Sequence, residues 1–393
     1  MFKAAVGHGI DPDSLGAIAE ALEQCQEALD GKIPQAGILM AAIDFDHVSL
    51  LDYVQNIYPD ILLIGGTSVG EMSSKMAFQQ DSLTLMLFYS DTVTFGAGVG
   101  YCANKDPKTA AAMAIDSALQ STTKDPEDIK LCYTLCEGLG VDGSALVQGL
   151  RAATNNAAPI YGGFVGDDYQ FEATYQFYQG EVLQNAVVVL TFFGNLHVSY
   201  GVANGQRPLG RKGVVTRSKG STIYEVDNKP AKYFYADYID EGEEVKIDGG
   251  TSFSRSIAVF EPEEHDFYVR SPHGETEDRS GINYFGSVPE HSVIQLTDAD
   301  CESLVDSAQQ AFSKAKETYP GVEPEAVLLV SCVSRMKNLG TQVHREYSVV
   351  EESIGSHIPN VGFYSYGEIS PFTAQNNALF HNETFTALLL GTR

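Results

Sequence analysis

Short apolar runs alternate with amphipathic stretches along residues 4–193, and one order of elements occurs there twice. The apolar runs predict buried strands, whereas apolar residues spaced three and four apart predict helices. In the first copy, strands are predicted over Ala4–His8, Ala36–Ile43, Ile61–Ile64 and Leu83–Tyr89, and helices over Ser14–Leu29 and Val48–Ile57. In the second copy, strands are predicted over Val93–Cys102, Ile129–Leu135, Pro159–Tyr161 and Ala186–Phe193, helices over Pro107–Leu119 and Ser144–Ala153, and a hairpin around Tyr175–Val182.

A third copy of this order follows a β-rich stretch at about residues 195–292. Its strands are predicted over Val293–Leu296, Ala326–Ser331, around Val361 and over Thr384–Leu390, and its helices over Asp298–Lys316 and Gln342–Ile354. The β-rich stretch is predicted to hold strands at His197–Val202, Gly213–Arg217, Ser254–Phe260 and Phe267–Val269 and an exposed connector at Asp240–Gly250. Buried strands alternating with helices predict an α/β fold with mixed sheets flanked by helices. We expect three β-α-β-α-β-turn-β repeats with a β-rich insertion.

A glycine turn with an acidic exit occupies the same slot in each copy, at Gly65–Glu71, Gly162–Asp168 and Gly362–Glu368. Glycine leaves no side chain in the way of a ligand, and turns at strand ends are where open α/β sheets place binding crevices. The carboxylates suit an ammonium group, or they accept backbone hydrogen bonds in turns that are only structural. The residues predicted to form a ligand wall are Gly66, Thr67, Ser68, Gly70, Glu71, Gly163, Gly166, Asp167, Tyr364, Tyr366, Gly367 and Glu368.

A ligand carboxylate would need a cation, and Arg207 is the best candidate because a guanidinium can grip two oxygens at once. It precedes Pro208 and Gly210 on a constrained loop. A solvated or ion-paired arginine is the alternative reading, and Arg335 and Arg255 are weaker candidates.

The composition narrows the class of partner. The chain has 393 residues, with 25 basic against 52 acidic side chains and a formal net charge of -27. This charge disfavours nucleic acid and anionic lipid, and the basic residues between Arg207 and Lys219 are too sparse to reverse it. No apolar run approaches the ~20 residues that span a bilayer, and the N-terminus lacks the long apolar core of a secretory signal. We therefore expect a cytoplasmic protein without a membrane span, with its six cysteines reduced.

Several motifs, taken in order along nearly the whole chain, resemble those of the FIST family of sensory proteins. They are Gly66–Glu71, Gly162–Asp168, Asn185–Leu190, Gly205–Gly210, Tyr224–Asp227, Pro230-Ala231, Gly362–Ile369 and His381–Thr386. The resemblance implies a FIST N-terminal domain over residues 1–222 and a FIST C-terminal domain over residues 223–393. It also implies a sensory role, because FIST regions commonly sit on histidine kinases, chemoreceptors and cyclic-di-GMP enzymes; we expect this chain to depart from that pattern as a sensor without an attached output domain. Such a sensor would regulate a separate histidine kinase or cyclic-di-GMP enzyme, and a homodimer is compatible with that role.

The resemblance implies two kinds of ligand. One free-standing branch of the family binds haem to sense nitric oxide, and amino acids are the ligands suggested for the family at large. Haem b is the leading expectation, and direct binding of an amino acid or similar metabolite is the alternative. Haem needs one neutral imidazole in an apolar pocket. We rank His381 first, because it precedes a buried strand, then His344 and then His197.

An enzyme is the third class of function. Cys136 follows a buried strand, as a nucleophile at a strand–helix turn would, and supports a hydrolase reading. The sequence holds no G-x-S-x-G, H-E-x-x-H or G-x-x-x-x-G-K-[ST] motif. We therefore expect no catalysis.

Overall fold

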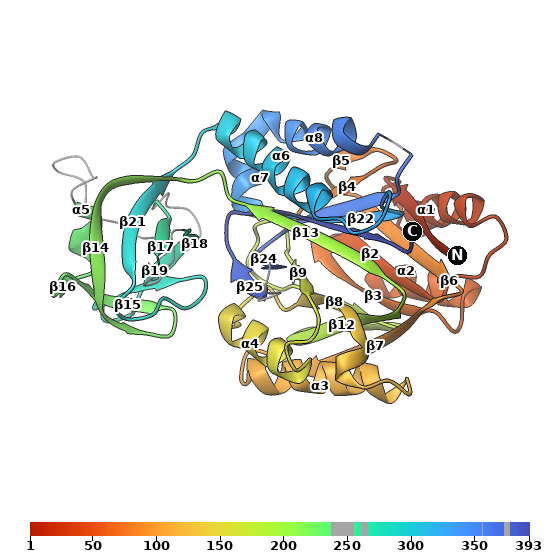
Figure 1. The fold of residues 1–393 in the computed structure, drawn as a ribbon, viewed down its shortest axis with the longest axis horizontal. Coiled ribbons are helices and arrows are strands. Elements are labelled where there is room, and N and C mark those ends of the chain that lie inside the picture. The colour runs from red at the N-terminus through yellow and green to blue at the C-terminus, as the bar shows by residue number, and fades with distance from the viewer. Residues whose placement is uncertain (237–254, 261–265, 356, 373–377) are drawn as a thin grey trace.

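The computed structural model describes residues 1–236, 255–260, 266–355, 357–372 and 378–393. They form a large body, residues 1–206 and 299–393, and a smaller β-rich lobe within residues 207–298 (Figure 1). Helices line the outside of the body and its sheets lie between them. The predicted α/β fold with mixed sheets flanked by helices is confirmed. Among the described residues, no helix is long and apolar enough to cross a membrane.

The body contains three repeats. The first comprises β1 (Phe2–Gly9), α1 (Ser14–Leu29), β2 (Ala36–Ala42), α2 (His47–Ile57), β3 (Leu62–Ser68), β4 (Glu71–Ser73), β5 (Ala77–Gln79) and β6 (Leu83–Ser90). The second comprises β7 (Val93–Tyr101), α3 (Pro107–Gln120), β8 (Ile129–Cys136), α4 (Gly143–Ala153), β9 (Ile160–Phe164), β10 (Gln176–Tyr178), β11 (Glu181–Leu183) and β12 (Ala186–Gly194). The third comprises β13 (His197–Ala203), α6 (Cys301–Glu317), β22 (Ala326–Cys332), α7 (Val333–Leu339), α8 (His344–Ile354), β23 (Asn360–Ser365), β24 (Gly367–Pro371), β25 (Ala378–His381) and β26 (Phe385–Gly391).

Each repeat builds four strands of one sheet and gives a two-stranded hairpin to another repeat. The sheet orders are β1-β6-β2-β3-β10-β11, β7-β12-β8-β9-β24-β25 and β13-β26-β22-β23-β4-β5. The first repeat therefore completes the third sheet, the second completes the first, and the third completes the second. In each sheet the two middle strands run parallel and the others antiparallel. This cyclic exchange joins the repeats into one body.

The inner faces of the three sheets share one apolar core, which holds residues such as Met86, Leu190 and Leu388. The outer faces carry the helices, and the first strand of each repeat meets its helix closely. Gly98 of β7 shows why a small residue is needed, because an added Cβ would lie 2.0 Å from the Ala114 carbonyl oxygen of α3. The glycines and alanines of this contact set the spacing between sheet and helix.

The lobe interrupts the third repeat between β13 and α6. It comprises β14 (Arg207–Lys219), β15 (Thr222–Val226), β16 (Lys229–Pro230), α5 (Lys232–Ala236), β17 (Ile257–Phe260), β18 (Tyr268–Arg270), β19 (Pro272–Glu275), β20 (Ile282–Tyr284) and β21 (Val293–Asp298). Its apolar cluster, which includes Val215, Phe234 and Ile294, contains no residue of the body among those described. Residue 222 lies inside this lobe, at the start of β15, so the predicted boundary between residues 222 and 223 falls within it.

Three expectations about elements need correction. Val293–Leu296 is not the first strand of the third repeat; β13 holds that place beside β26, and β21 belongs to the lobe. The glycine turns begin later than predicted, because Gly65–Ser68 continue β3 and pair with β2. The predicted sequence of elements also lacked α7. The expected connector Asp240–Gly250 lies outside the described residues.

Candidate functional site

The three predicted glycine turns meet at one end of the body. The amide of Val69 donates to the Tyr364 carbonyl, that of Gly166 to Thr67, and that of Tyr366 to Phe164, at 3.0–3.2 Å. These bonds form a closed ring, each running from one repeat to another. The structure thus brings together turns that lie about 100 and 200 residues apart in the sequence. The ring lies where the parallel strands end, the edge at which α/β sheets place ligands.

One position of the repeat faces this end of the body with a fully buried polar side chain in all three copies: Glu71, Gln176 and Glu368. Each accepts a hydrogen bond from the segment that leads into the last strand of its own repeat. Ser82 Oγ donates to Glu71 at 2.5 Å, the Ala186 amide to Gln176 at 2.9 Å, and the Thr384 amide to Glu368 at 3.0 Å. Gln176 is equivalent because β10 pairs with β3 as β4 pairs with β23.

Burial changes the acidity of the two carboxyl groups. It raises the pKa of Glu71 to about 7, against the opposing effect of hydrogen bonds from Ser68 and Ser82. It likewise raises the pKa of Glu368 to about 7, against hydrogen bonds from Thr384 and Ser365. Both groups therefore titrate near neutral pH inside the protein. Because both carboxyl groups are buried and bonded to a neighbouring segment, they fit a structural link between segments better than a ligand wall open to solvent.

In the first repeat, His8 extends this hydrogen-bonded link through Ser82. Its Nε2 lies 3.0 Å from Ser82 Oγ, and its Nδ1 lies 2.7 Å from Ser73 Oγ. Since Ser82 donates its proton to Glu71, Nε2 is the donor toward Ser82 and Nδ1 accepts from Ser73. Burial lowers the pKa of His8 to about 4, so the ring is neutral at physiological pH. His8, Ser82 and Glu71 thus form a buried row of hydrogen bonds in which each side chain donates its proton to the next.

A groove of about 460 Å³ opens beside His8. Its lining consists of the end of β1, one face of α1 and the β4–β5 turn: His8, Ile10, Glu20, Glu23, Gln24, Glu27 and Met76. Gln24 donates to the His8 carbonyl at 2.8 Å, and Glu20 accepts from the Ile10 amide at 3.1 Å, so they cover the open edge of β1. Glu23 and Glu27 point into the groove from the exposed side of α1. The groove is therefore acidic and lies between two sheets: all of its lining residues belong to the first repeat, but the β4–β5 hairpin pairs in the third sheet.

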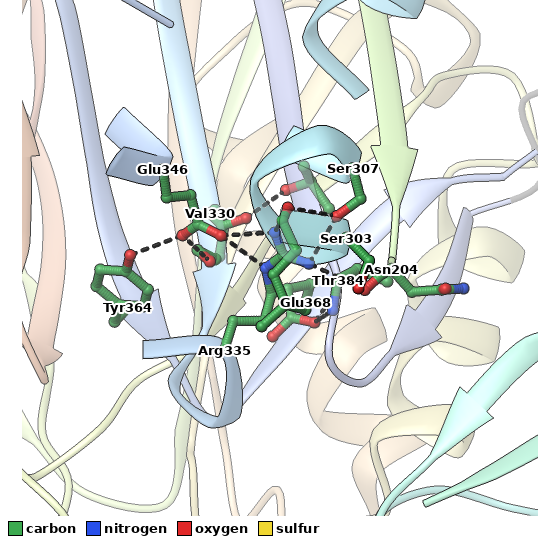
Figure 2. Close-up of polar contacts among 12 residues, drawn as sticks. Asn204, Ser303, Ser307, Val330, Arg335, Glu346, Tyr364, Glu368 and Thr384 are labelled. Carbon is green, nitrogen blue, oxygen red and sulfur yellow. Dashed lines mark hydrogen bonds and ion pairs between the residues drawn. The ribbon is translucent and has the colours of Figure 1, made fainter. Parts of the chain in front are cut away.

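A second polar centre lies in the third repeat (Figure 2). Arg335 of α7 and Glu346 of α8 form an ion pair at 2.6 Å with both side chains fully buried. Arg335 also donates to the carbonyls of Asn204 and Leu304 at 3.0 and 2.8 Å, and Glu346 accepts from Tyr364 at 2.6 Å. Asn204 and Leu304 lie where the chain leaves the body for the lobe and returns from it. Arg335 therefore fixes both connections, and a structural role accounts for all of its contacts.

The remaining residues that the sequence singled out lie in other surroundings. Asp167 is buried and accepts from Tyr366 at 2.5 Å and from the amides of residues 171–173, so it caps a loop. Arg207 is exposed and pairs with Asp300 at 2.5 Å. Cys136 is fully buried, and burial raises the pKa of its thiol to about 12, so the thiol is protonated at neutral pH. Asp167, Arg207 and Cys136 do not line the groove beside His8.

The three histidines ranked for haem differ in their surroundings. His381 is buried, and its Nε2 lies 2.9 Å from the Ser370 carbonyl oxygen. His344 is exposed at the start of α8. His197 lines an open cavity of about 320 Å³ together with Lys130 and Tyr200, near the lower end of the range for small-molecule sites. The residues fit haem only in part: His197 offers an imidazole beside apolar residues such as Leu196 and Val198, but the cavity is open to solvent.

Sequence reasoning missed His8, Gln176 and Glu346. His8 follows an apolar strand, where a histidine that is only structural looks the same. Gln176 is an amide where the other repeats carry an acid, and no glycine precedes it. A search for the Gly-Glu pair seen at Gly70-Glu71 and Gly367-Glu368 therefore misses it. Its equivalence appears only when β10 is seen to pair with β3.

The described residues thus form three repeated sheets with exchanged hairpins and an acidic surface groove. Comparison with known families places this architecture. Residues 35–229 match the FIST N domain and residues 231–371 match the FIST C domain, so the chain belongs to the FIST family. Membership implies that it senses a small ligand in signalling.

Relatives match from about three fifths to nearly all of the chain. An uncharacterized protein of Mycobacterium tuberculosis is 24% identical over 392 residues, which is 95% of this chain and 96% of that protein. An uncharacterized protein of Methanocaldococcus jannaschii is 25% identical over 262 residues, 59% of this chain and 48% of that protein. Among solved structures, a cyanuric acid hydrolase of A. caulinodans aligns over 100% of this chain and 99% of its own at 10% identity, with a TM-score of 0.43. A likeness at that level says nothing about activity.

Proposed function

We propose that this chain is a non-catalytic sensor that binds a small amine-bearing metabolite, such as an amino acid or a diamine, in the groove between α1 and the β4–β5 turn. The observation that carries the proposal is the acidic groove itself, of about 460 Å³. Its carboxylates suit an ammonium group, while Ile10 and Met76 offer apolar surface to the rest of the ligand.

The groove is placed so that binding can alter the relative position of the first and third sheets. Its α1 wall belongs to the first sheet, whereas Met76 belongs to the hairpin that completes the third. A ligand that touches both walls binds more tightly to one relative position of the two sheets, which is the requirement for a sensor with two conformations. His8 and Ser82 connect the groove to Glu71 at the base of the same hairpin. We propose that the output passes to a separate signalling enzyme, a histidine kinase or a cyclic-di-GMP enzyme.

Thermal unfolding with three probes tests the ligand class. 1,4-Diaminobutane and glycine carry ammonium groups, and acetate carries only a carboxylate. We expect the diamine to raise Tm most and acetate to leave it unchanged. A ligand present at 100 times its Kd stabilises the folded state by about 2.7 kcal/mol.

Variants locate the binding. The double variant Glu23→Gln/Glu27→Gln removes two groove charges and should abolish the shift caused by the diamine. Glu317→Gln is the matched control, because Glu317 is an exposed carboxylate on α6, the corresponding helix of the third repeat. An equal shift in the groove variant and in the control would contradict the proposed site. A Soret band after haem addition, lost in His197→Ala, would instead support haem as the ligand.

A further inference from the structure

The lobe meets the body through polar contacts at a narrow base. Two short connections join them, at residues 204–206 and 299–300. The lobe has its own apolar core, and none of the body's three large clusters includes a lobe residue among those described. Units joined in this way are expected to move relative to one another unless a large apolar interface holds them.

The centre of this base is Glu383, which lies between β25 and β26 of the body. It accepts hydrogen bonds from Ser256 and from Ser271, the latter at 2.9 Å, and both serines belong to the lobe. It also accepts from Gln206 of the first connection at 2.5 Å. The Glu383 side chain is 8% exposed, so its carboxylate is held by three donors away from solvent.

Comparison of the repeats shows that this glutamate is unusual at its position. The residue just before Ser82, Ala186 or Thr384 has a left-handed backbone in all three copies: Asp81 at φ 51°, Asn185 at φ 55° and Glu383 at φ 59°. Asp and Asn tolerate this conformation because their short side chains bond locally, whereas glutamate has no such advantage.

The equivalent residues, Asp81 and Asn185, indicate what the longer side chain of Glu383 adds. Asn185 binds Asn104, which follows the first strand of its repeat, just as Glu383 binds Gln206. Asp81 is exposed. Only in the third repeat does the side chain continue beyond this local bond and reach a separate unit. The fold does not require a glutamate here, and docking of the lobe accounts for its length.

Other contacts set the geometry of the base. Arg270 of the lobe donates to the Phe380 carbonyl at 3.1 Å and lies over the Phe380 ring, with its guanidinium carbon 5.5 Å from the ring centre. The Ser287 amide donates to Ser144 at 3.1 Å. Arg335 of the body donates to the carbonyls of Asn204 and Leu304, beside the two connections. Arg335 therefore fixes the two connections, while the rest of the base consists, among the described residues, of a few directional contacts.

We propose that the lobe is a hinged arm that docks reversibly on the body, with Glu383 as its latch and Arg335 as the anchor of its pivot. Release of Ser256 and Ser271 frees the lobe to swing and uncovers the Phe380 face. Docking of the lobe requires no ligand in the groove.

Hydrogen exchange and small-angle scattering of the full ligand-free chain test the latch. Glu383→Asn installs the residue that the second repeat carries at this position. We expect amide exchange in β19 and β25 to rise at least about tenfold, because loss of even one charge-assisted hydrogen bond has that effect and Glu383 accepts two from the lobe. The radius of gyration should increase. Asp81→Asn is the matched control, because it makes a similar exchange of an acid for Asn at the equivalent position away from the lobe. It should change neither quantity.

Two results would overturn the proposal: wild-type exchange and radius in Glu383→Asn, or equal changes in Asp81→Asn. If Glu383→Asn also exposes β1 and β6, general unfolding explains the change, and Glu383→Gln decides the matter. This variant keeps the length and one acceptor oxygen, so it should give intermediate exchange in β19 with β1 and β6 protected. Failure of that pattern would refute the latch, whatever the groove binds.

Discussion

At the scale of single residues, the equivalence of Glu71, Gln176 and Glu368 separates what the fold requires from what each repeat adds. All three are fully buried and accept a hydrogen bond from the start of the following strand. Because an amide serves in one repeat, the fold needs an acceptor at this position and not a negative charge. The two carboxyl groups are therefore a source of pH dependence that Gln176 lacks.

We expect Glu71→Gln to reduce the loss of stability on going from pH 5 to pH 8. The folded-state pKa of Glu71, about 7, lies above the ordinary value of 4.5 for a glutamate, so the folded state binds more protons in that window. Stability consequently falls as pH rises from about 4.5 through 7, by up to roughly 3 kcal/mol per group at about 1.4 kcal/mol per pH unit. Urea unfolding at both pH values measures the change. Glu317→Gln is the exposed control, and an undiminished pH slope in Glu71→Gln would show that Glu71 is ionised at little cost.

The Arg335–Glu346 pair offers a second prediction at this scale. Arg335→Met leaves the Glu346 carboxylate buried without its cation, and such a loss costs about 3–5 kcal/mol. The double variant Arg335→Met/Glu346→Leu removes both charges and should recover part of that stability. Chemical denaturation of the two variants measures the difference. Equal stability of the single and double variants would mean that the pair contributes only through packing.

At the scale of elements, the contact between β7 and α3 depends on the absence of side chains. A Cβ on Gly98 would approach the Ala114 carbonyl oxygen to 2.0 Å and the Ala118 amide nitrogen to 2.4 Å. We expect Gly98→Ala to push α3 from the sheet and to cost about 1–3 kcal/mol, as overpacking typically does. Gly31→Ala is the control, because nothing lies within 4 Å of an added Cβ there and only its φ of 75° opposes the change. Thermal unfolding of both variants should place Gly98→Ala lower.

The helices and strands were the features that the sequence predicted best. Strongly periodic segments such as Ala36–Ala42 and Pro107–Gln120 followed from their apolar spacing alone. The three glycine turns were found as a set, and they do meet. Their role was not accessible, because burial of Glu71 depends on β4 pairing with β23, almost 300 residues away. The error over Val293–Leu296 has the same origin: its pattern suits a strand, and only pairing tells a lobe strand from a repeat strand.

At the scale of the whole molecule, the hairpin exchange determines which pieces can exist alone. Cleavage between residues 222 and 223 would leave β13 without β26 and β9 without β24. It would also separate β4 from β23 and divide the inner core among both fragments. The two family domains thus follow one another in the sequence, but their strands pair with each other in the same sheets. By contrast, the lobe has its own core, and Arg207 pairs with Asp298, so its two ends lie side by side.

We therefore expect the fragment 1–222 to remain unfolded when expressed alone, although it corresponds to the predicted N-terminal domain. A body in which a short Gly-Ser linker joins Gln206 to Ala299 should fold, because the removed lobe begins and ends at neighbouring strands. Near-UV circular dichroism and the cooperativity of urea unfolding distinguish the two outcomes, since an incomplete core gives neither a fixed aromatic environment nor a sharp transition. Cooperative unfolding of the fragment 1–222 would show that its strands pair without the C-terminal half, and the exchange of hairpins would then be a consequence of folding rather than its condition.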